Sequence, residues 1–259
     1  MNNLDISPTT LVLVASLVAA SLFISYKEKL GITKETLIAV TRAIVQLIVV
    51  GFVLQYIFDA KEWFLTLAMY LVIIFNAALN AGKRSTDLSR KDGFVISFVA
   101  LIFSVSITMA ILLLSHAIEF KAMQVVPISG MLANNTLAAL GLVYRNMHQQ
   151  YHDLHEQVIE RLALGASIKD ASYEIYRNAL RMGMQPQIDT AKTLGIVSLP
   201  GMMSGLIFAG VSPVSAIKYQ IMVTFMLFGS TGIGCLIATF LTYRQYFNDR
   251  AQLRDVTNK

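Results

Sequence analysis

Three histidines are the residues of this sequence whose spacing is best suited to metal binding. His148, His152 and His155 are four and three positions apart, so one helix would present all three imidazoles on a single face. Neutral imidazole is a common ligand of divalent transition metals. The spacing predicts either a metal site or an ordinary solvated helix face just outside a membrane.

Methionine thioethers are a second set of candidate metal ligands. Met202 and Met203 are adjacent in an apolar stretch, and further methionines concentrate in the last three apolar runs. Thioethers bind soft metals, but methionine also fills gaps in apolar cores. We expect the packing role for most of these residues and keep Met202 and Met203 as candidate ligands.

The sequence lacks the residues needed for nucleotide binding or covalent catalysis. The segment 82–85 (GKRS) has neither the upstream glycine nor the hydroxyl directly after lysine that a P-loop requires. The single cysteine, Cys235, excludes a disulfide framework and a cysteine zinc site. The apolar runs contain no convincing nucleophile and base, so we expect no enzymatic activity and no cofactor. Any ATP-driven work requires another chain.

The composition is that of a membrane protein. Of 259 residues, 55% are hydrophobic and 14% are charged, and the mean hydropathy is +0.59. A soluble domain would contain about a quarter charged residues, and runs of about 20 apolar residues are long enough to cross a bilayer. We predict an all-α, polytopic membrane protein with one transmembrane domain over residues 1–259. Its dispersed basic residues argue against nucleic-acid binding.

Seven membrane spans are expected. They cover about 9–26, 36–58, 63–81, 94–117, 122–147, 188–210 and 216–243. Most of the 21 Lys and Arg residues fall in alternate connecting segments. The positive-inside rule then places the N-terminus outside, the C-terminus inside and the segment between spans five and six in the cytoplasm.

The segment 148–186 is the longest polar stretch and predicts a cytoplasmic hairpin of two amphipathic halves. Leu154, Val158 and Leu162 form an apolar stripe in the first half, and Gly165 is expected to stop it. Ser167 then acts as an N-cap, with Asp170 three residues later. The expected apolar face of the second half is Ile168, Ala171, Ile175, Ala179 and Met182, and Pro186 is expected to end it. The hairpin is suited either to docking a partner or to lying on lipid headgroups.

Two of the spans are expected to be irregular. In span five, Pro127, Gly130 and the pair Asn134–Asn135 predict an interruption, and at least one of the two Asn side chains is expected to bond a neighbouring helix or a cavity.

In span six, Pro200 predicts a kink. Gly201, Gly205 and Ala209 form a small-residue seam in the same span. The seam is equally compatible with packing inside one chain and with a dimer or transport pathway. Asp189 is the lone candidate for an intramembrane acid, and its spacing from Lys192 favours a local ion pair.

The segment 163–167 (ALGAS), which follows Glu160, resembles the cytoplasmic coupling loop of ABC-transporter permeases. In the general pattern the glutamate lies one residue further from the glycine, and Arg161 stands where the first alanine is expected. Over nearly its full length the chain resembles the FetB-type permeases, which include a bacterial iron exporter and plant aluminium-tolerance permeases. The stretches that carry this resemblance are 25–30 (SYKEKL), 42–51 (RAIVQLIVVG), 123–131 (MQVVPISGM) and 189–227.

The resemblance implies a permease subunit in the bacterial inner membrane. It implies a homodimer that works with two copies of a separately encoded cytoplasmic ATPase and exports iron or a related metal ion. The residues that would contact the ATPase are Glu160, Leu164, Gly165, Ala166 and Ser167. From the residues alone, a stand-alone secondary carrier or channel remains the alternative, although the lack of acidic residues inside the first five spans weakens the carrier hypothesis.

Overall fold

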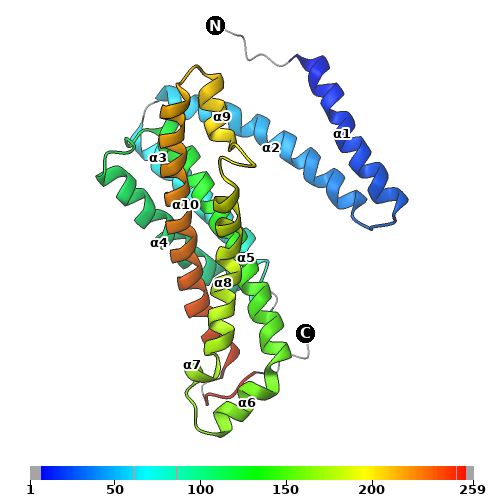
Figure 1. The fold of residues 1–259 in the computed structure, drawn as a ribbon, viewed down its shortest axis with the longest axis vertical. Helices are drawn as coiled ribbons and strands as arrows, with labels where there is room; N and C mark the ends of the chain where they lie inside the picture. The colour runs from blue at the N-terminus through cyan, green and yellow to red at the C-terminus, as the bar shows by residue number, and fades with distance from the viewer. Residues whose placement is uncertain (1–6, 61, 86, 249, 255–259) are drawn as a thin grey trace. The chain divides into compact units, whose positions relative to one another are not determined.

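The computed structural model describes residues 7–60, 62–85, 87–248 and 250–254. Across these residues the secondary structure is helical, without a β-strand (Figure 1). Six of the helices are long and apolar enough to cross a membrane. The prediction of an all-α polytopic membrane protein is therefore confirmed. The chain divides into two compact units, Met1–Ala60 and Lys61–Lys259, which are described separately.

The first unit is a pair of long apolar helices, α1 (Pro8–Lys27) and α2 (Thr33–Ala60). Ser7 caps α1 by accepting a hydrogen bond from the backbone N–H of Thr10 at 3.3 Å. At the turn between the helices, the hydroxyls of Ser25 and Thr33 are 2.9 Å apart. These two helices correspond to the first two predicted spans.

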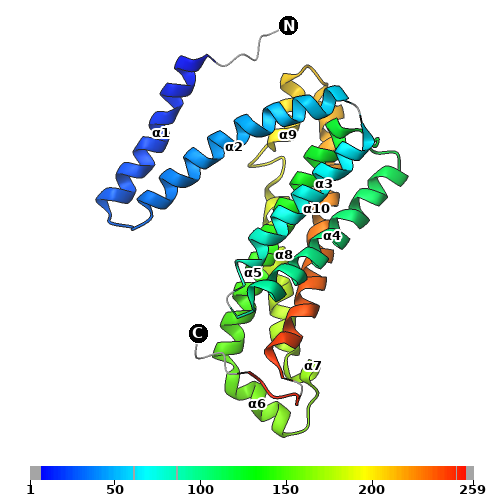
Figure 2. The same ribbon diagram turned by 180° about the vertical axis from the view of Figure 1, so that it is seen from behind.

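The second unit is a bundle in which α5 packs against four other long helices (Figures 1 and 2). The long helices are α3 (Trp63–Gly82), α4 (Arg90–Leu114), α5 (Ala122–Asp153), α8 (Tyr173–Thr193) and α10 (Pro213–Thr242). The shorter elements are α6 (His155–Ala163), α7 (Ile168–Ala171), α9 (Gly201–Phe208) and the 3₁₀ helix η1 (Tyr243–Tyr246). Within this bundle, α6 and α7 lie at one end and α9 lies at the other (Figure 1).

Close packing fixes α8 in the bundle. A Cβ atom added to Gly183 of α8 would lie 2.7 Å from Val143 Cγ2 of α5 and 2.8 Å from Cys235 Sγ of α10. Only glycine permits this approach, so α8 is held between both neighbours. A hydrogen bond of 3.0 Å between the buried hydroxyls of Thr136 and Ser230 also joins α5 to α10.

The structure corrects two predicted helix boundaries. Helix α5 is unbroken through Pro127, Gly130 and the Asn134–Asn135 pair, so the predicted interruption of span five is wrong. Helix α8 likewise runs through Pro186 to Thr193. A proline in a helix removes one backbone hydrogen bond, so both helices continue despite that loss.

The predicted sixth span, 188–210, is a discontinuous passage and not one helix. Helix α8 ends at Thr193, residues 194–200 are not helical, and α9 has only eight residues. Pro200 is the N-cap of α9 with an extended backbone, so it marks a complete break where a kink was expected. The α8 segment, the break and α9 together follow α10 along the bundle (Figures 1 and 2).

Candidate functional site

The candidate functional site is the polar hairpin between α5 and α8, which is shorter than the predicted segment 148–186 because α5 extends to Asp153 and α8 begins at Tyr173. Its first half is α6, whose apolar stripe is placed as predicted. Val158 is buried, and Leu154 and Leu162 pack partly buried against the core of the second unit. This stripe attaches α6 to the end of the bundle and leaves its opposite face exposed.

A tight turn with a defined hydrogen-bond pattern ends α6. Gly165 has a φ of +89°, which confirms the predicted left-handed conformation. Its N–H donates to the carbonyl of Leu162, and the N–H of Ala166 donates to the carbonyl of Arg161, both at 3.0 Å. These two bonds form a Schellman motif, so the turn satisfies carbonyls that the helix end would leave free.

The second half begins with the predicted cap. The hydroxyl of Ser167 accepts a hydrogen bond from the backbone N–H of Asp170 at 3.1 Å and donates to its carboxylate at 2.6 Å. Of the predicted apolar face, Ile168 is partly buried, and Ala171, Ile175 and Ala179 are buried. Met182, on the same helix as Ile175 and Ala179, is 43% exposed, so the buried part of this face does not extend to it.

Arg161 connects the two halves of the hairpin. One of its guanidinium nitrogens donates to the carbonyl of Ala171 at 3.4 Å, and another is 3.3 Å from the carboxylate of Glu174. Arg161 occupies the position where the general permease pattern has alanine. In this chain, that departure supplies a contact that holds α6 against α7 and α8.

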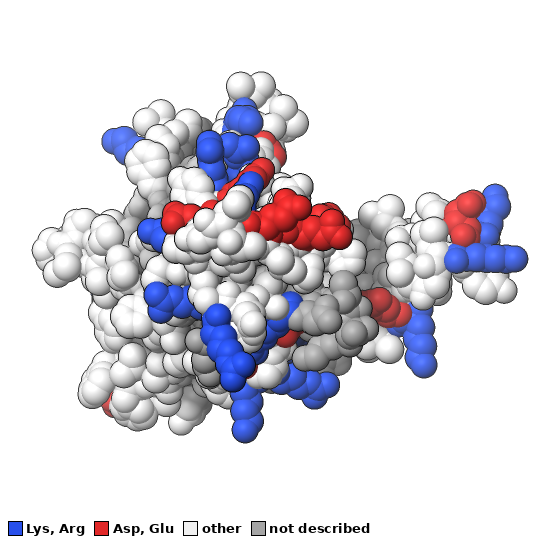
Figure 3. Space-filling model, turned by 90° about the horizontal axis from the view of Figure 1, so that it is seen from below, with Lys and Arg blue, Asp and Glu red and all other residues white. Residues whose placement is uncertain are grey.

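An exposed apolar side chain projects from the turn. Leu164 is 88% exposed and directly precedes Gly165, while Glu160 is exposed one helical turn earlier. Figure 3 views the bundle from this end, where acidic and basic side chains gather around the hairpin. The exposed acidic residues of the region are Asp153, Glu156, Glu160, Asp170 and Glu174. An apolar side chain on a rigid turn, surrounded by charged groups, is suited to a protein partner.

The structure does not bring the three predicted histidine ligands together. His148 lies on α5, and its Nδ1 atom is 2.7 Å from both carboxylate oxygens of Asp87. The Nδ1 atom of His152 lies 3.3 Å from the carboxylate of the adjacent Asp153. His155 starts α6, after the helix is broken at Leu154. Among the described residues, no group of three or more His, Cys, Asp or Glu side chains could hold a metal ion.

Asp87 is a residue that the sequence reasoning missed. Besides His148 of α5, it accepts a 2.7 Å hydrogen bond from the hydroxyl of Tyr246 in η1. The Tyr246 ring also stacks on the buried Tyr151 of α5, with centroids 3.9 Å apart. These contacts tie the loop between α3 and α4, the end of α5 and the end of α10 together beside the hairpin. Partners 61 and 159 positions apart leave no local pattern in a sequence.

The predicted packing and pathway residues occupy different environments. Asn135 accepts a hydrogen bond from the Gln187 side chain of α8 at 2.9 Å, which confirms that one of the two asparagines bonds a neighbouring helix. Asn134 is exposed, and Pro127 lies within α5. A Cβ atom added to Gly201 or Gly205 would meet no other atom, so the small-residue seam packs on nothing within the described part of the chain.

The discontinuous passage borders a cavity of about 370 Å³ against α10. Met203 and Pro200 line it, whereas Met202 packs against the core of the second unit. Gln220 of α10 also lines the cavity, and its side-chain oxygen is buried without a hydrogen-bond partner in the described structure. Sequence reasoning missed Gln220, although an amide in the apolar first half of α10 is a signal that could have identified it. Asp189, on the α8 side of the break, forms the expected local ion pair with Lys192 at 3.3 Å.

Comparison with known proteins gives consistent matches over nearly the whole chain. A family model described as "Uncharacterised protein family (UPF0014)" matches residues 8–247. The "Probable iron export permease protein FetB" of Escherichia coli (strain K12) is 50% identical over 253 residues, which cover 98% of this chain and 97% of that protein. The "UPF0014 membrane protein STAR2" of Oryza sativa subsp. japonica is 35% identical over 240 residues, 93% of this chain and 84% of that protein.

"Protein ALUMINUM SENSITIVE 3" of Arabidopsis thaliana is 32% identical over 237 residues, which cover 92% of this chain and 86% of that protein. No solved structure shows significant similarity to the chain. The resemblance to the FetB-type permeases is confirmed.

Proposed function

Because this chain belongs to the UPF0014 family of membrane proteins, we propose that it is the membrane-spanning permease subunit of an ABC transporter that exports a metal ion. Iron as the cargo and export as the direction are supported by the name of the E. coli relative. The permease itself performs no hydrolysis in this proposal. A separately encoded cytoplasmic ATPase supplies the energy.

The exposed turn at Leu164 and Gly165 is the observation that carries this proposal. A membrane subunit without a P-loop needs a rigid element that enters a cleft of its ATPase. The turn is rigid because the Schellman bonds, the Ser167 cap and the Arg161 contacts fix both sides of it. It is accessible because Leu164 is 88% exposed. A lipid-bound hairpin would instead direct its apolar stripe outward, whereas the stripe of α6 is packed against the bundle.

Helix α8 supplies a mechanical route from this turn to the transport pathway. It starts next to the hairpin, is held tightly at Gly183 between α5 and α10, and ends at the break in the sixth passage. When two ATPase copies close on ATP, each hairpin moves with its ATPase and shifts α8 as a rigid rod. Movement of the carboxyl end of α8 then changes the conformation of the break at 194–200. The pathway thereby opens alternately to the two sides of the membrane.

In this proposal two copies of the chain form the pathway in the bacterial inner membrane. The N-terminus is outside and the hairpin is in the cytoplasm, as the distribution of Lys and Arg favours. The carboxyl end of the described chain also lies toward the hairpin end of the bundle (Figure 1). The exposed Gly201 and Gly205 are available for packing against a second copy.

Site-specific crosslinking tests the proposed ATPase contact. In a background with Cys235 replaced by Ser, Leu164→Cys is labelled with a photoreactive thiol reagent in native membranes. The expected product joins the permease to an ATPase that contains a P-loop. Leu114→Cys is the matched control, since Leu114 is 80% exposed at the opposite end of the bundle and should give no such product. A stand-alone carrier would give no ATPase product from either position.

A further inference from the structure

We infer that a cavity between the start of α8 and the end of α10 binds the head group of an anionic phospholipid from the cytoplasmic leaflet. Lys169 and Arg244 supply its positive charge, and tyrosine and phenylalanine rings form most of its lining. The inference rests on the proposed cytoplasmic position of the hairpin. It concerns a ligand other than the transported ion.

The cavity has a volume of about 240 Å³ and is formed by two parts of the chain that lie side by side at the hairpin end of the bundle (Figures 1 and 2). The ring of Tyr176 in α8 meets that of Tyr243 in η1 edge-on, with centroids 6.1 Å apart. The ring of Phe240 in α10 lies 5.8 Å from the same tyrosine ring. These aromatic contacts hold the two parts together. The residues that line the cavity are Lys169, Ser172, Tyr173, Tyr176, Phe240 and Tyr243.

The cavity lies where the apolar part of α10 ends. The sequence contains no charged residue between Lys218 and Arg244, and Arg244 is in η1, directly after α10. Phe240 is in the last turn of α10 and is 45% exposed. Aromatic and basic side chains together are typical of the cytoplasmic membrane–water interface. With the hairpin in the cytoplasm, the cavity is therefore level with the lipid head groups of that leaflet.

Two cationic side chains flank the cavity. The guanidinium of Arg244 lies over the Phe240 ring, 5.5 Å from its centroid, and its Nε donates to the hydroxyl of Tyr243 at 3.3 Å. Both of these rings line the cavity, so the guanidinium is held at its edge. Lys169 of α7 lines the cavity from the hairpin. Within the described part of the chain, neither cation pairs with a carboxylate.

The acidic groups of α7 and of the start of α8 are engaged away from the cavity. The carboxylate of Asp170 accepts a 2.6 Å hydrogen bond from Ser167, and that of Glu174 lies 3.3 Å from the guanidinium of Arg161. Neither acid lines the cavity. Arg177, one helical turn after Tyr173, is exposed and adds a further positive charge next to it. The surroundings of the cavity therefore favour an anion.

A phospholipid phosphate suits this combination of groups. Arginine and lysine donate charge-assisted hydrogen bonds to phosphate oxygens, and the forked guanidinium can bind two oxygens at once. Basic pockets between membrane helices on the cytoplasmic side bind anionic head groups. Phe240 lies one turn closer to the membrane than Arg244, so the acyl chains can follow the apolar surface of α10 while the phosphate reaches the cations.

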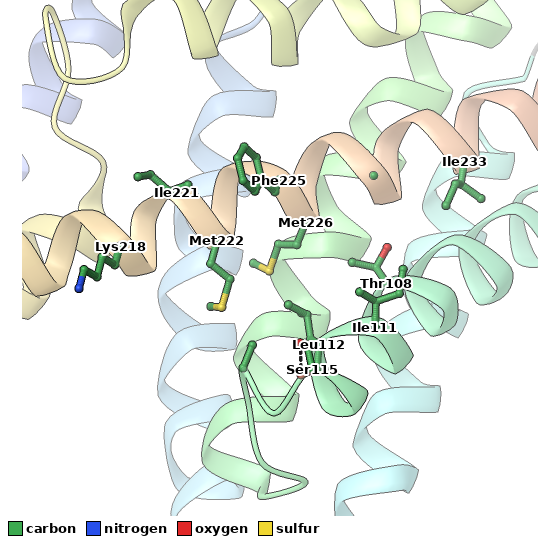
Figure 4. Close-up of a pocket in the computed structure, with 12 residues that line it drawn as sticks. Thr108, Ile111, Leu112, Ser115, Lys218, Ile221, Met222, Phe225, Met226 and Ile233 are labelled. Carbon is green, nitrogen blue, oxygen red and sulfur yellow. Dashed lines mark hydrogen bonds between the residues drawn. The ribbon is translucent and has the colours of Figure 1, made fainter.

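The larger cavity between α4 and α10 does not suit a phosphate. It has a volume of about 430 Å³, and Met222 and Met226 are among its apolar lining residues (Figure 4). Lys218 is the one charged residue in its described lining, at the other end of the bundle. Its two hydroxyl side chains, those of Thr108 and Ser115, already donate to backbone carbonyls at 2.8 and 3.1 Å. The cavity at the hairpin end therefore suits a phosphate better.

A bound head group would link the hairpin to the end of α10. Lys169 belongs to α7 within the hairpin, whereas Arg244 belongs to η1. A phosphate that binds both side chains would hold α7 against η1. It would thereby stabilise the position of the turn at Gly165, which is the proposed docking element for the ATPase. The anionic lipid content of the cytoplasmic leaflet then regulates how well the ATPase associates.

Titration of the purified full-length chain with phosphatidylglycerol in a neutral detergent tests the inference, with bound lipid counted by native mass spectrometry. We expect tighter binding of phosphatidylglycerol than of phosphatidylcholine, which has a phosphate but no net charge. Lys169→Gln and Arg244→Gln should each weaken phosphatidylglycerol binding about fivefold, and the double variant about thirtyfold. The matched control is the pair Arg90→Gln and Lys91→Gln, which removes two exposed charges at the start of α4. This control should bind like the wild type.

Four results would overturn the inference. They are equal affinity for the two lipids, wild-type affinity in the double variant, an equal loss in the control pair, and displacement of the lipid by millimolar glycerol 3-phosphate. An equal loss in the control would show diffuse attraction to basic surface, and displacement would identify a soluble phosphate ester as the ligand.

Folding and the transporter assignment are checked separately. Lys169 and Arg244 are exposed, so their variants should fold, and thermal melting of each variant verifies this. Lys169→Gln alone, in the hairpin, remains informative if the double variant does not fold. Lipid binding is measured without the ATPase, and crosslinking of the ATPase at position 164 is measured in parallel. Failure of the lipid site is therefore distinguishable from failure of the transporter assignment.

Discussion

The imidazole Nδ1 of His148 lies 2.7 Å from both carboxylate oxygens of Asp87, and this pair joins α5 to the loop that precedes α4. The hydroxyl of Tyr246 donates to the same carboxylate at 2.7 Å. Three elements therefore meet on one acid beside the hairpin. The pairing gives His148 a structural contact between α5 and this loop that its spacing from His152 and His155 did not predict.

Tyr246→Phe tests the strength of this junction. The substitution keeps the ring that stacks on Tyr151 and removes only the hydrogen bond to Asp87. We expect a loss of about 0.5–1.5 kcal/mol in the free energy of unfolding, measured by denaturant titration in detergent micelles. Tyr26→Phe, at a side chain that is 77% exposed, should change nothing. Equal stability of both variants would show that the junction is not structural.

Replacement of the three histidines tests the metal site suggested by their spacing. In the structure His148 is engaged by Asp87, and the helix breaks between His152 and His155. We therefore expect the triple Gln variant to retain the zinc and iron content of the wild-type protein, measured by mass spectrometry after purification. A loss of bound metal in the triple variant would instead support the hypothesis that the three histidines bind a metal ion.

Local sequence signals predicted the turn of the hairpin. Features that depend on contacts between residues far apart in the sequence were not predicted. Gly165 and Ser167 act through bonds to residues within a few positions, so their roles could be inferred from the sequence alone. Pro186 was predicted to end a helix, but α8 continues through it to Thr193, and the close packing at Gly183 is a tertiary contact that the sequence does not show. The Asp87–His148 pair depends on the tertiary fold in the same way.

In the candidate pathway too, local signals predicted some features and tertiary contacts determined the others. Pro200 indicated an irregularity in the sixth passage, but the complete break over 194–200 follows from the conformation of the whole loop. The side-chain oxygen of Gln220 is buried without a hydrogen-bond partner in the described structure, an environment that no local pattern in the sequence predicts. Sequence patterns thus located the elements of the site, and packing determined their contacts.

Gly183→Ala tests whether α8 is held rigidly between its neighbours. The added methyl group would lie 2.7 Å from Val143 Cγ2 and 2.8 Å from Cys235 Sγ, so we expect a loss of about 1–3 kcal/mol in stability. Gly51→Ala is the matched control, because an added Cβ there meets no atom and alanine favours a helix. The control should be neutral or stabilising. A Gly183→Ala protein as stable as the control would contradict tight packing of α8.

Cysteine labelling tests the membrane orientation. With Cys235 replaced beforehand, a membrane-impermeant thiol reagent should label Ser167→Cys only from the cytoplasmic side and Ala60→Cys only from outside. Ser167 is exposed on the hairpin, so failure to label from either side would not result from burial in the chain. Reversed labelling would place the hairpin outside, where it could not meet an ATPase.

The central claim is that the turn at Gly165 docks the ATPase, and co-purification of a tagged ATPase with Gly165 variants tests it most directly. Gly165 has a φ of +89°, and an added Cβ would touch nothing, so substitution acts through backbone conformation alone. Gly165→Ala should cost about 1 kcal/mol and reduce association mildly. Gly165→Val should insert normally, because apolar length decides insertion.

Valine is β-branched and strongly disfavours the left-handed conformation, so we expect the Gly165→Val protein to reach the membrane in normal amounts and to lose the ATPase. Association should therefore fall in the order wild type, Gly165→Ala, Gly165→Val at equal permease levels. Full retention of the ATPase by well-expressed Gly165→Val protein would contradict the account, because the hairpin would then not be the docking element.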